Sequence, residues 1–224
     1  MKYTNDILKK WCYRVSCLSV LFILWGCASG AHVVSGVSIP DPLIDPFPMK
    51  VGVYYPPELK DFVHDVKKGR QSFVVELGEN QEQVFEKSLG ALFDEVITLE
   101  SEDDDRKDRL DGVFYPNVTG VTLTIPAENG TDFYEVWIRY ELLLQQPNGT
   151  YIYKWPVPGY GRVNRRDYGS VLERTNEAVL NATESALRSA CTEIIVRFSP
   201  RRIPLTVKDW IELNTMSSTT EDVD

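Results

Sequence analysis

The chain has 224 residues, of which 43% are hydrophobic and 25% are charged, proportions that are typical of a globular protein. Its formal net charge is -9. Nucleic acids and anionic lipid headgroups select basic proteins, so this acidic balance argues against both as direct ligands. Four cysteines and two histidines show none of the spacings of a metal site.

The first 26 residues have the pattern of a bacterial export signal. Four Lys and Arg residues and one Asp give them a net charge of +3, and an apolar run, VSCLSVLFILW, fills residues 15–25. This run is too short to span a bilayer, which takes about 20 residues, but it fits the core of a signal peptide. The part that would remain after cleavage carries a net charge of -12.

The apolar run ends in Leu24, Trp25, Gly26 and Cys27. These residues resemble the bacterial lipobox. In that motif an aliphatic residue lies three positions before the lipidated cysteine, and a small residue lies directly before it. Leu24 and Gly26 match this pattern, whereas Trp25 is bulkier than usual. Three acyl chains on Cys27 would anchor the mature protein far more firmly than one. The alternatives are a secreted protein with an incidental cysteine and an uncleaved anchor helix.

The lipobox resemblance also implies a location. An Asp directly after the lipidated cysteine favours retention in the inner membrane, but Ala28 and Ser29 follow Cys27 here. We therefore expect a lipid anchor in the outer membrane, with the domain on the periplasmic side.

The remaining chain divides into three parts. Residues 27–48 contain the lipidated cysteine and four prolines, which is typical of a tether. Residues 49–213 are predicted to form a single domain. Residues 214–224 (NTMSSTTEDVD) are polar and acidic, and we expect them to be a disordered tail.

The first half of the domain alternates between strand and helix patterns. Residues 50–56 (KVGVYYP) and 71–77 (QSFVVEL) favour strands. Residues 81–96 place apolar side chains at helical spacing, with Asn80 as the expected N-cap. A short strand at 96–100 follows.

The second half is rich in strands and ends in a long helix. Strands are predicted at 111–126, 133–146 and 150–156, and Asn148-Gly149 is a strong hairpin signal between the last two. Residues 157–169 (VPGYGRVNRRDYG) are predicted to form a loop. Residues 172–198 have an apolar face with many alanines, so this helix can lie close against a sheet, and Pro200 follows its end.

This order predicts an α+β fold: a single mixed or antiparallel sheet with two amphipathic helices packed on one face. The lipobox, KVGVYYP, FEKSLGALFDEVITL, YEVWIRYELLLQQPNGTYIYKW and the Ala-rich helix together resemble small envelope-assembly lipoproteins. Among these are the lipopolysaccharide-assembly lipoprotein and the N-terminal domain of the Tol-system β-propeller protein. The resemblance is topological, covers about two-thirds of the chain, and implies no functional residue.

No residue pattern indicates catalysis, a metal site or a cofactor. His64 is expected on the surface, and Cys191 is expected to be buried on the apolar face of the last helix. The acidic stretch 101–111 (SEDDDRKDRLD) lacks the spacing of an EF-hand loop and is expected to be a solvated loop. Without a credible histidine base beside a Ser or Cys, we expect no enzymatic activity.

The predicted loop concentrates basic charge in an otherwise acidic chain: Arg162, Arg165 and Arg166, flanked by Tyr160 and Tyr168. One interpretation is a connection whose arginines pair with nearby carboxylates of the same chain. The other is a surface for an anionic ligand or a partner, because interfaces favour Arg and Tyr.

These observations leave two hypotheses of function. The first is a lipid-anchored accessory or scaffold subunit of an envelope assembly or transport system, with an envelope protein as its partner and no nucleic acid. The second is a module that binds an anionic lipid or glycan.

Overall fold

The computed structural model describes residues 44–69, 71–168 and 172–221, so the predicted signal peptide, the lipobox and most of the tether lie outside it. The elements, in chain order, are β1 (Phe47–Tyr54), α2 (Pro57–Lys60), β2 (Val63–Lys68), β3 (Gln71–Glu76), α3 (Gly78–Leu92), β4 (Phe93–Leu99), η1 (Asp105–Arg109), β5 (Gly112–Thr124), α4 (Pro126–Asn129), β6 (Phe133–Gln145), β7 (Tyr151–Asn164), η2 (Arg165–Asp167), α5 (Leu172–Arg197) and α6 (Leu205–Glu221).

Five strands form one mixed sheet in the order β4-β1-β5-β6-β7. Strand β1 runs parallel to β4 and β5, whereas β5, β6 and β7 are antiparallel. Strands β2 and β3 form a separate two-stranded sheet, so the prediction of a mixed sheet is confirmed and that of a single sheet is wrong. The sequence did not reveal β2, because its residues VHDVKK are mostly polar and only partly buried.

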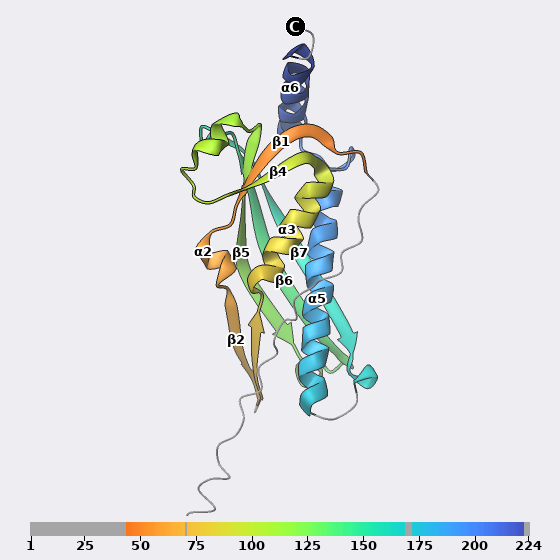
Figure 1. The fold of residues 1–224 in the computed structure, drawn as a ribbon. Helices are drawn as coiled ribbons and strands as arrows, with labels where there is room; N and C mark the ends of the chain where they lie inside the picture. Colours follow the sequence, from red (N-terminus) through yellow and green to blue (C-terminus); the bar gives the residue numbers. More distant parts are fainter. Residues whose placement is uncertain (1–43, 70, 169–171, 222–224) are drawn as a thin grey trace, which may run out of the picture.

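Helices α3 and α5 contact each other and lie on the same face of the large sheet, as predicted (Figure 1). Their apolar sides form one core with the inward side chains of the strands. Helix α3 begins at Gly78, where φ is +39°, so the expected N-cap at Asn80 is wrong. Asn80 lies in the first turn, and its side chain is buried rather than capping the helix end.

Helix α5 approaches β7 so closely that only glycine fits between their backbones. A Cβ at Gly161 would overlap the carbonyl oxygen of Ala182, and one at Gly159 would overlap that of Ala186. The predicted small-residue face of this helix is therefore confirmed. The predicted loop at 157–169 is wrong for residues 157–164, which continue β7 and pair with β6 as far as Asn164 opposite Phe133.

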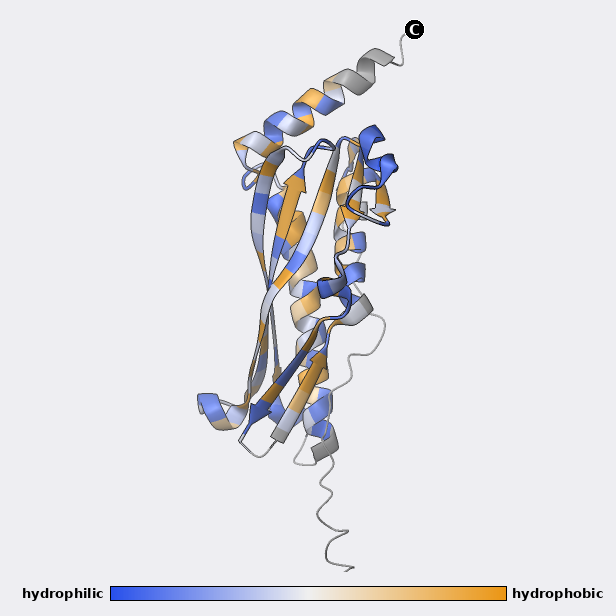
Figure 2. Ribbon diagram, turned by 90° about the vertical axis from the view of Figure 1, so that its left-hand side faces the viewer, coloured by the Kyte–Doolittle hydropathy of each residue, from blue (hydrophilic) through white to orange (hydrophobic). Residues whose placement is uncertain are grey.

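The chain continues beyond the predicted end of the domain as helix α6, which projects past the end of the sheet (Figures 1 and 2). The disordered tail expected from residue 214 is thus helical as far as Glu221. Val207, Trp210 and Ile211 are buried, and the Trp210 indole donates a hydrogen bond of 2.8 Å to the backbone oxygen of Asp111. Spaced three and four residues apart, these three side chains attach the first half of α6 to the domain.

Leu92 on α3 and Leu187 on α5 test this core. Both are buried, with 3% and 0% of their surface exposed. Substitution by Ala at either position is expected to lower the free energy of unfolding by about 2–5 kcal/mol, because each leaves a cavity between helix and sheet. Leu205→Ala is the matched control, since Leu205 is 77% exposed, and its cost should stay below about 0.5 kcal/mol. Denaturant unfolding of the three variants measures this, and equal values for all three would show that the helix faces are misassigned.

Candidate functional site

The residues predicted to be functional fall into two groups. The lipobox, Leu24, Trp25, Gly26 and Cys27, lies outside the described residues, so its assignment stays a prediction. The arginine segment is described, but it does not form one loop. Tyr160 and Arg162 belong to β7, whereas Arg165 and Arg166 lie in η2.

Polar contacts within the same domain hold Arg165, Arg166 and Tyr168. Arg165 and Arg166 both form ion pairs with Asp132, with 2.9 Å between Arg165 Nε and Asp132 Oδ1. The Tyr168 hydroxyl accepts a hydrogen bond of 2.8 Å from the side-chain amide of Asn181. For Arg165 and Arg166, pairing with a nearby carboxylate of the same chain is therefore the correct interpretation.

Tyr160 and Arg162 point to the other side of the sheet. Side chains alternate between the two faces of a strand, and Gly159 and Gly161 face α5. Residues 160 and 162 consequently face away from both helices. We call this side of β5, β6 and β7 the open face. Its central residues are Thr122 on β5, Trp137 and Arg139 on β6, and Pro158, Tyr160 and Arg162 on β7.

An aromatic pair lies at the centre of the open face. Trp137 and Tyr160 are directly opposite each other on β6 and β7, with their ring centroids 4.4 Å apart. The Tyr160 hydroxyl donates a hydrogen bond of 2.9 Å to Glu135 Oε1, and burial together with this carboxylate raises the pKa of Tyr160. Trp137 remains 43% exposed, so a large apolar surface faces solvent.

One arginine lies on each side of this pair. Arg162 is opposite Glu135 in the register, yet its guanidinium lies over the Phe133 ring, 4.6 Å from the centroid. Arg139 extends across β5, where a Cβ at Gly120 would lie 2.6 Å from its Nη2. Within the described residues, neither guanidinium has a carboxylate within ion-pair distance, unlike Arg165 and Arg166.

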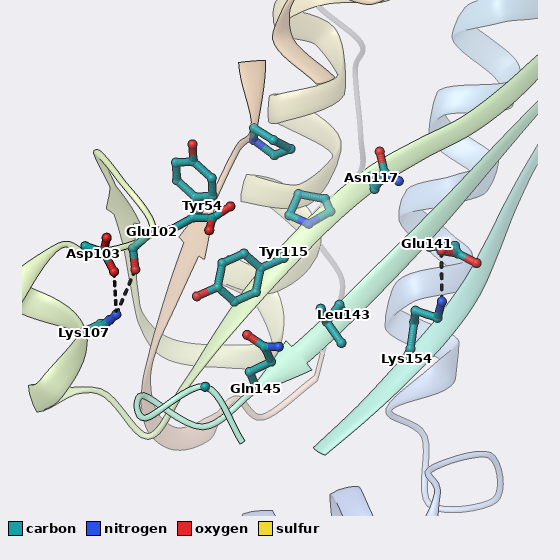
Figure 3. A pocket seen from close by; sticks show the side chains of 13 residues that line it. Tyr54, Glu102, Asp103, Lys107, Tyr115, Asn117, Glu141, Leu143, Gln145 and Lys154 are labelled. Atoms are coloured by element: carbon teal, nitrogen blue, oxygen red, sulfur yellow. Dashed lines mark hydrogen bonds and ion pairs between the residues drawn. The ribbon is translucent and has the colours of Figure 1, made fainter. Parts of the chain in front are cut away.

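The same face is hollowed towards the other end of the strands. A groove of about 500 Å³ lies beside Tyr115, Leu143 and Lys154, and the acidic loop forms its rim (Figure 3). The rings of Tyr54 and Tyr115 meet edge to face at 6.2 Å, and Lys154 pairs with Glu141 at 3.1 Å. The groove thus has partly aromatic walls, and both lysines that line it are already paired with carboxylates: Lys107 with Asp103 and Lys154 with Glu141.

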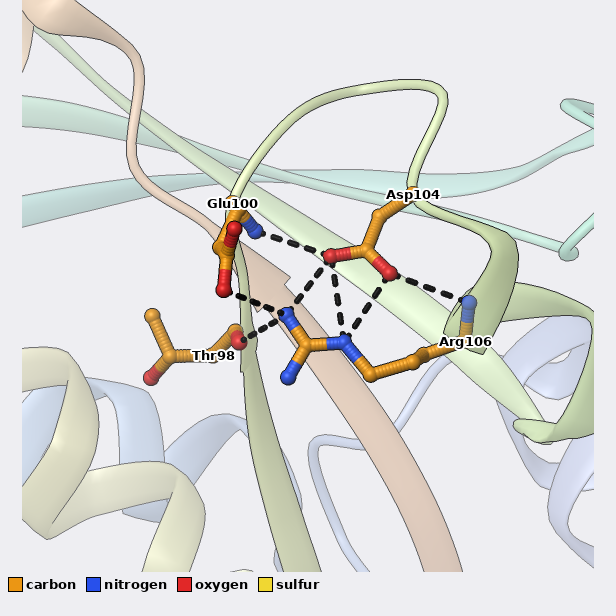
Figure 4. Close-up of polar contacts among 4 residues, drawn as sticks. All are labelled: Thr98, Glu100, Asp104 and Arg106. Carbon is orange, nitrogen blue, oxygen red and sulfur yellow. Dashed lines mark hydrogen bonds and ion pairs between the residues drawn. The ribbon is translucent and has the colours of Figure 1, made fainter.

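The acidic loop is held together by Asp104 and Arg106 (Figure 4). The Asp104 carboxylate accepts hydrogen bonds from the Arg106 side chain and from the backbone N–H groups of Glu100 and Arg106. These bonds, that of the Arg106 side chain above all, hold the pKa of Asp104 well below its usual range. The expectation of a merely solvated loop is therefore too simple, because the cluster closes the turn between β4 and β5. In the described residues, no three His, Cys, Asp or Glu side chains gather in a metal-site geometry.

The two remaining candidates of the sequence have structural surroundings. His64 lies on β2, partly exposed, and its pKa is lowered by burial and then by Lys68. Cys191 is buried in the core as predicted, and burial raises the pKa of its thiol to about 11. Such a thiol is a weak nucleophile at neutral pH.

Trp137 and Arg139 were not singled out from the sequence. The signal was present in residues 133–146, where Val136, Ile138 and Tyr140 alternate with more polar residues. If these alternating apolar side chains are buried under the helices, the side chains between them must face outwards. What the sequence did not show is that β7 continues far enough to bring Tyr160 beside Trp137.

No helix in the described ranges is both long and apolar enough to span a membrane. The chain matches no protein-family model, and no curated protein matches it.

Several solved structures resemble the fold. A minor lipoprotein from Acinetobacter baumannii is 12% identical, with a TM-score of 0.41 and coverage of 73% of this chain and 97% of that one. A candidate lipoprotein from Caulobacter crescentus is 11% identical, with a TM-score of 0.39 and coverage of 65% and 85%. A candidate homolog of neuraminyllactose-binding hemagglutinin from Helicobacter pylori is 12% identical, with a TM-score of 0.46 and coverage of 84% and 100%.

All three TM-scores lie below 0.5, so these resemblances establish neither a shared family nor a shared function. The similarity to lipopolysaccharide-assembly lipoproteins expected from the sequence likewise stays a prediction.

Proposed function

We propose that this chain is a lipid-anchored accessory or scaffold subunit of a bacterial envelope assembly or transport system, and that it acts by protein–protein interaction. Its anchor is Cys27, in the outer membrane with the domain in the periplasm, and its binding surface is the open face. The observation that carries the proposal is the exposed Trp137, stacked on Tyr160 and flanked by two arginines without carboxylate partners in the described residues.

The composition of the open face supports binding. Trp, Tyr and Arg are the side chains that most often dominate the energy of protein interfaces. On the described part of this face no Ser or Cys lies beside a histidine base, so binding accounts for its residues better than catalysis.

The outer edge of β7 is poorly suited to binding a partner strand, which favours the open face as the binding surface. Among the strands that the structure describes, β7 pairs only with β6, and Pro156 and Pro158 lie in the middle of β7. Proline has no N–H group and occurs in sheets mainly on edge strands, with its nitrogen directed away from the neighbouring strand, so residues 156 and 158 offer no donors along the outer edge. A partner that added a strand there would lack these two bonds, whereas a partner on the open face would not.

A module for an anionic lipid or glycan is the second candidate. The guanidiniums of Arg139 and Arg162, which have no carboxylate partner among the described residues, favour it, because such forks bind phosphate as well as carboxylate. The large apolar surface of Trp137 between them is accounted for better by a protein partner.

Lipidation is tested by Cys27→Ala. Because the thiol is the acceptor of the lipid, this variant is expected to lose labelling by a fatty-acid analogue and cleavage of the leader at this site. Cys17→Ala, in the same leader, is the matched control and should keep both. Equal labelling of the two variants would refute the lipobox assignment.

The binding surface is tested by photo-crosslinking in intact cells. A photoreactive amino acid at Thr122, which lies opposite Trp137 on β5 and is exposed, is expected to capture a discrete envelope protein. The same probe at Arg188, exposed on the solvent side of α5, should not capture it. Identical products from both positions, or none from Thr122, would remove the open face as the interaction surface.

A further inference from the structure

We infer that the partner on the open face presents an extended acidic segment, with two carboxylates that bind Arg139 and Arg162 and an apolar side chain between them that packs on Trp137. This inference rests on the proposed function, because it names the chemistry of the partner that the open face binds.

The first step is that several arginines of this acidic protein form ion pairs with carboxylates of the same chain. Arg106 pairs with Asp104, Arg165 and Arg166 with Asp132, and two arginines of α5 with carboxylates one helical turn away. Arg139 and Arg162 belong to the described cations without such a partner. On a chain with net charge -9, these two guanidiniums give the open face positive charges that can attract an acidic partner.

The second step is that the nearest carboxylates are already engaged. Glu135, opposite Arg162, accepts hydrogen bonds from Tyr160 and from the side chain of Asn129. Glu141, two residues after Arg139 on the same face, pairs with Lys154. The Arg139 guanidinium contacts only a neutral acceptor on this face, the Thr122 hydroxyl at 3.5 Å, and neither guanidinium has a carboxylate partner among the described residues. A carboxylate of a partner would match their planar fork.

The third step is the spacing of the three features. Along the β6–β7 ladder, Arg162 lies opposite residue 135, the aromatic pair lies at residue 137, and Arg139 lies at residue 139. A strand rises about 3.4 Å per residue, so the two arginines lie in rows about 14 Å apart, with Trp137 midway. An extended peptide has the same rise, and the Arg162 guanidinium lies over Phe133, two residues before residue 135. Acidic residues about four to six positions apart on such a peptide can therefore reach the two arginines, and an apolar residue between them can reach Trp137.

This spacing predicts a partner sequence in which two acidic residues flank an apolar residue. A lipid headgroup or a glycan could bind the two guanidiniums. Nothing in its chemistry requires an apolar group between them that contacts Trp137.

The experiment uses the full-length lipoprotein in intact cells with the photoreactive probe at Thr122. The yield of the crosslinked protein is compared among the unsubstituted chain, Arg139→Glu with Arg162→Glu, and Arg188→Glu as the matched reversal on α5. The double reversal is expected to lower the yield about tenfold or more, because it opposes like charges across the contact. Arg188→Glu should leave the yield within about twofold. Mass spectrometry of the crosslinked peptide should show two acidic residues that flank an apolar residue.

A gentler pair, Arg139→Gln with Arg162→Gln, covers the case in which charge reversal perturbs folding, and it should still lower the yield severalfold. A captured protein whose yield is unchanged in both double variants would overturn the acidic-segment inference and leave the proposed function intact. So would a crosslinked peptide without acidic residues. Capture of a lipid or glycan in place of a protein would overturn both, and absence of any product from Thr122 would overturn the proposed function itself.

Discussion

The contact between the backbones of α5 and β7 fixes the orientation of everything on the open face. At Gly159 and Gly161 there is no room for a Cβ beneath the carbonyl oxygens of Ala182 and Ala186. A strand has two faces and its side chains alternate between them, so residues 160 and 162 have only the outer side available. The alanines of α5 and the glycines of β7 are therefore complementary parts of one constraint.

The register of the sheet carries this orientation from β7 to its neighbours. Strand β6 pairs with β7 along nearly its whole length, which places Trp137 beside Tyr160 and Arg139 beside Pro158. The inward residues of β6, Val136, Ile138 and Tyr140, are buried beneath the helices. A shift by one residue would expose these apolar side chains and bury Trp137 and Arg139, so the core itself maintains the binding surface.

Much of the fold follows from periodicity in the sequence, and its departures have identifiable causes. The long helix and the strand at 133–146 are predicted because their apolar residues repeat at helical and alternating spacing. The second half of β7 is not predicted, because glycine and proline signal a loop and equally suit an edge strand pressed against a helix. Similarly, Arg165 and Arg166 are recognisable as a basic cluster, but Asp132, which neutralises them, lies more than thirty positions earlier. Helix α6 escapes prediction because its buried apolar contacts are concentrated at Val207, Trp210 and Ile211, while its later turns are mostly polar and expose Leu213 and Met216.

The measurement that tests the α5–β7 constraint most directly compares Gly161→Ala with Gly120→Ala. An added Cβ at Gly161 meets backbone atoms of α5, which cannot move without displacing the helix, whereas at Gly120 it meets the flexible end of the Arg139 side chain. We predict that Gly161→Ala lowers the free energy of unfolding by about 3 kcal/mol or more, and Gly120→Ala by less than about 1 kcal/mol. If Gly161→Ala unfolds at the same denaturant concentration as the unsubstituted protein, α5 does not lie against β7 in this way. The outward orientation of Tyr160 and Arg162, and with it the open face as a binding surface, would then lose its structural basis.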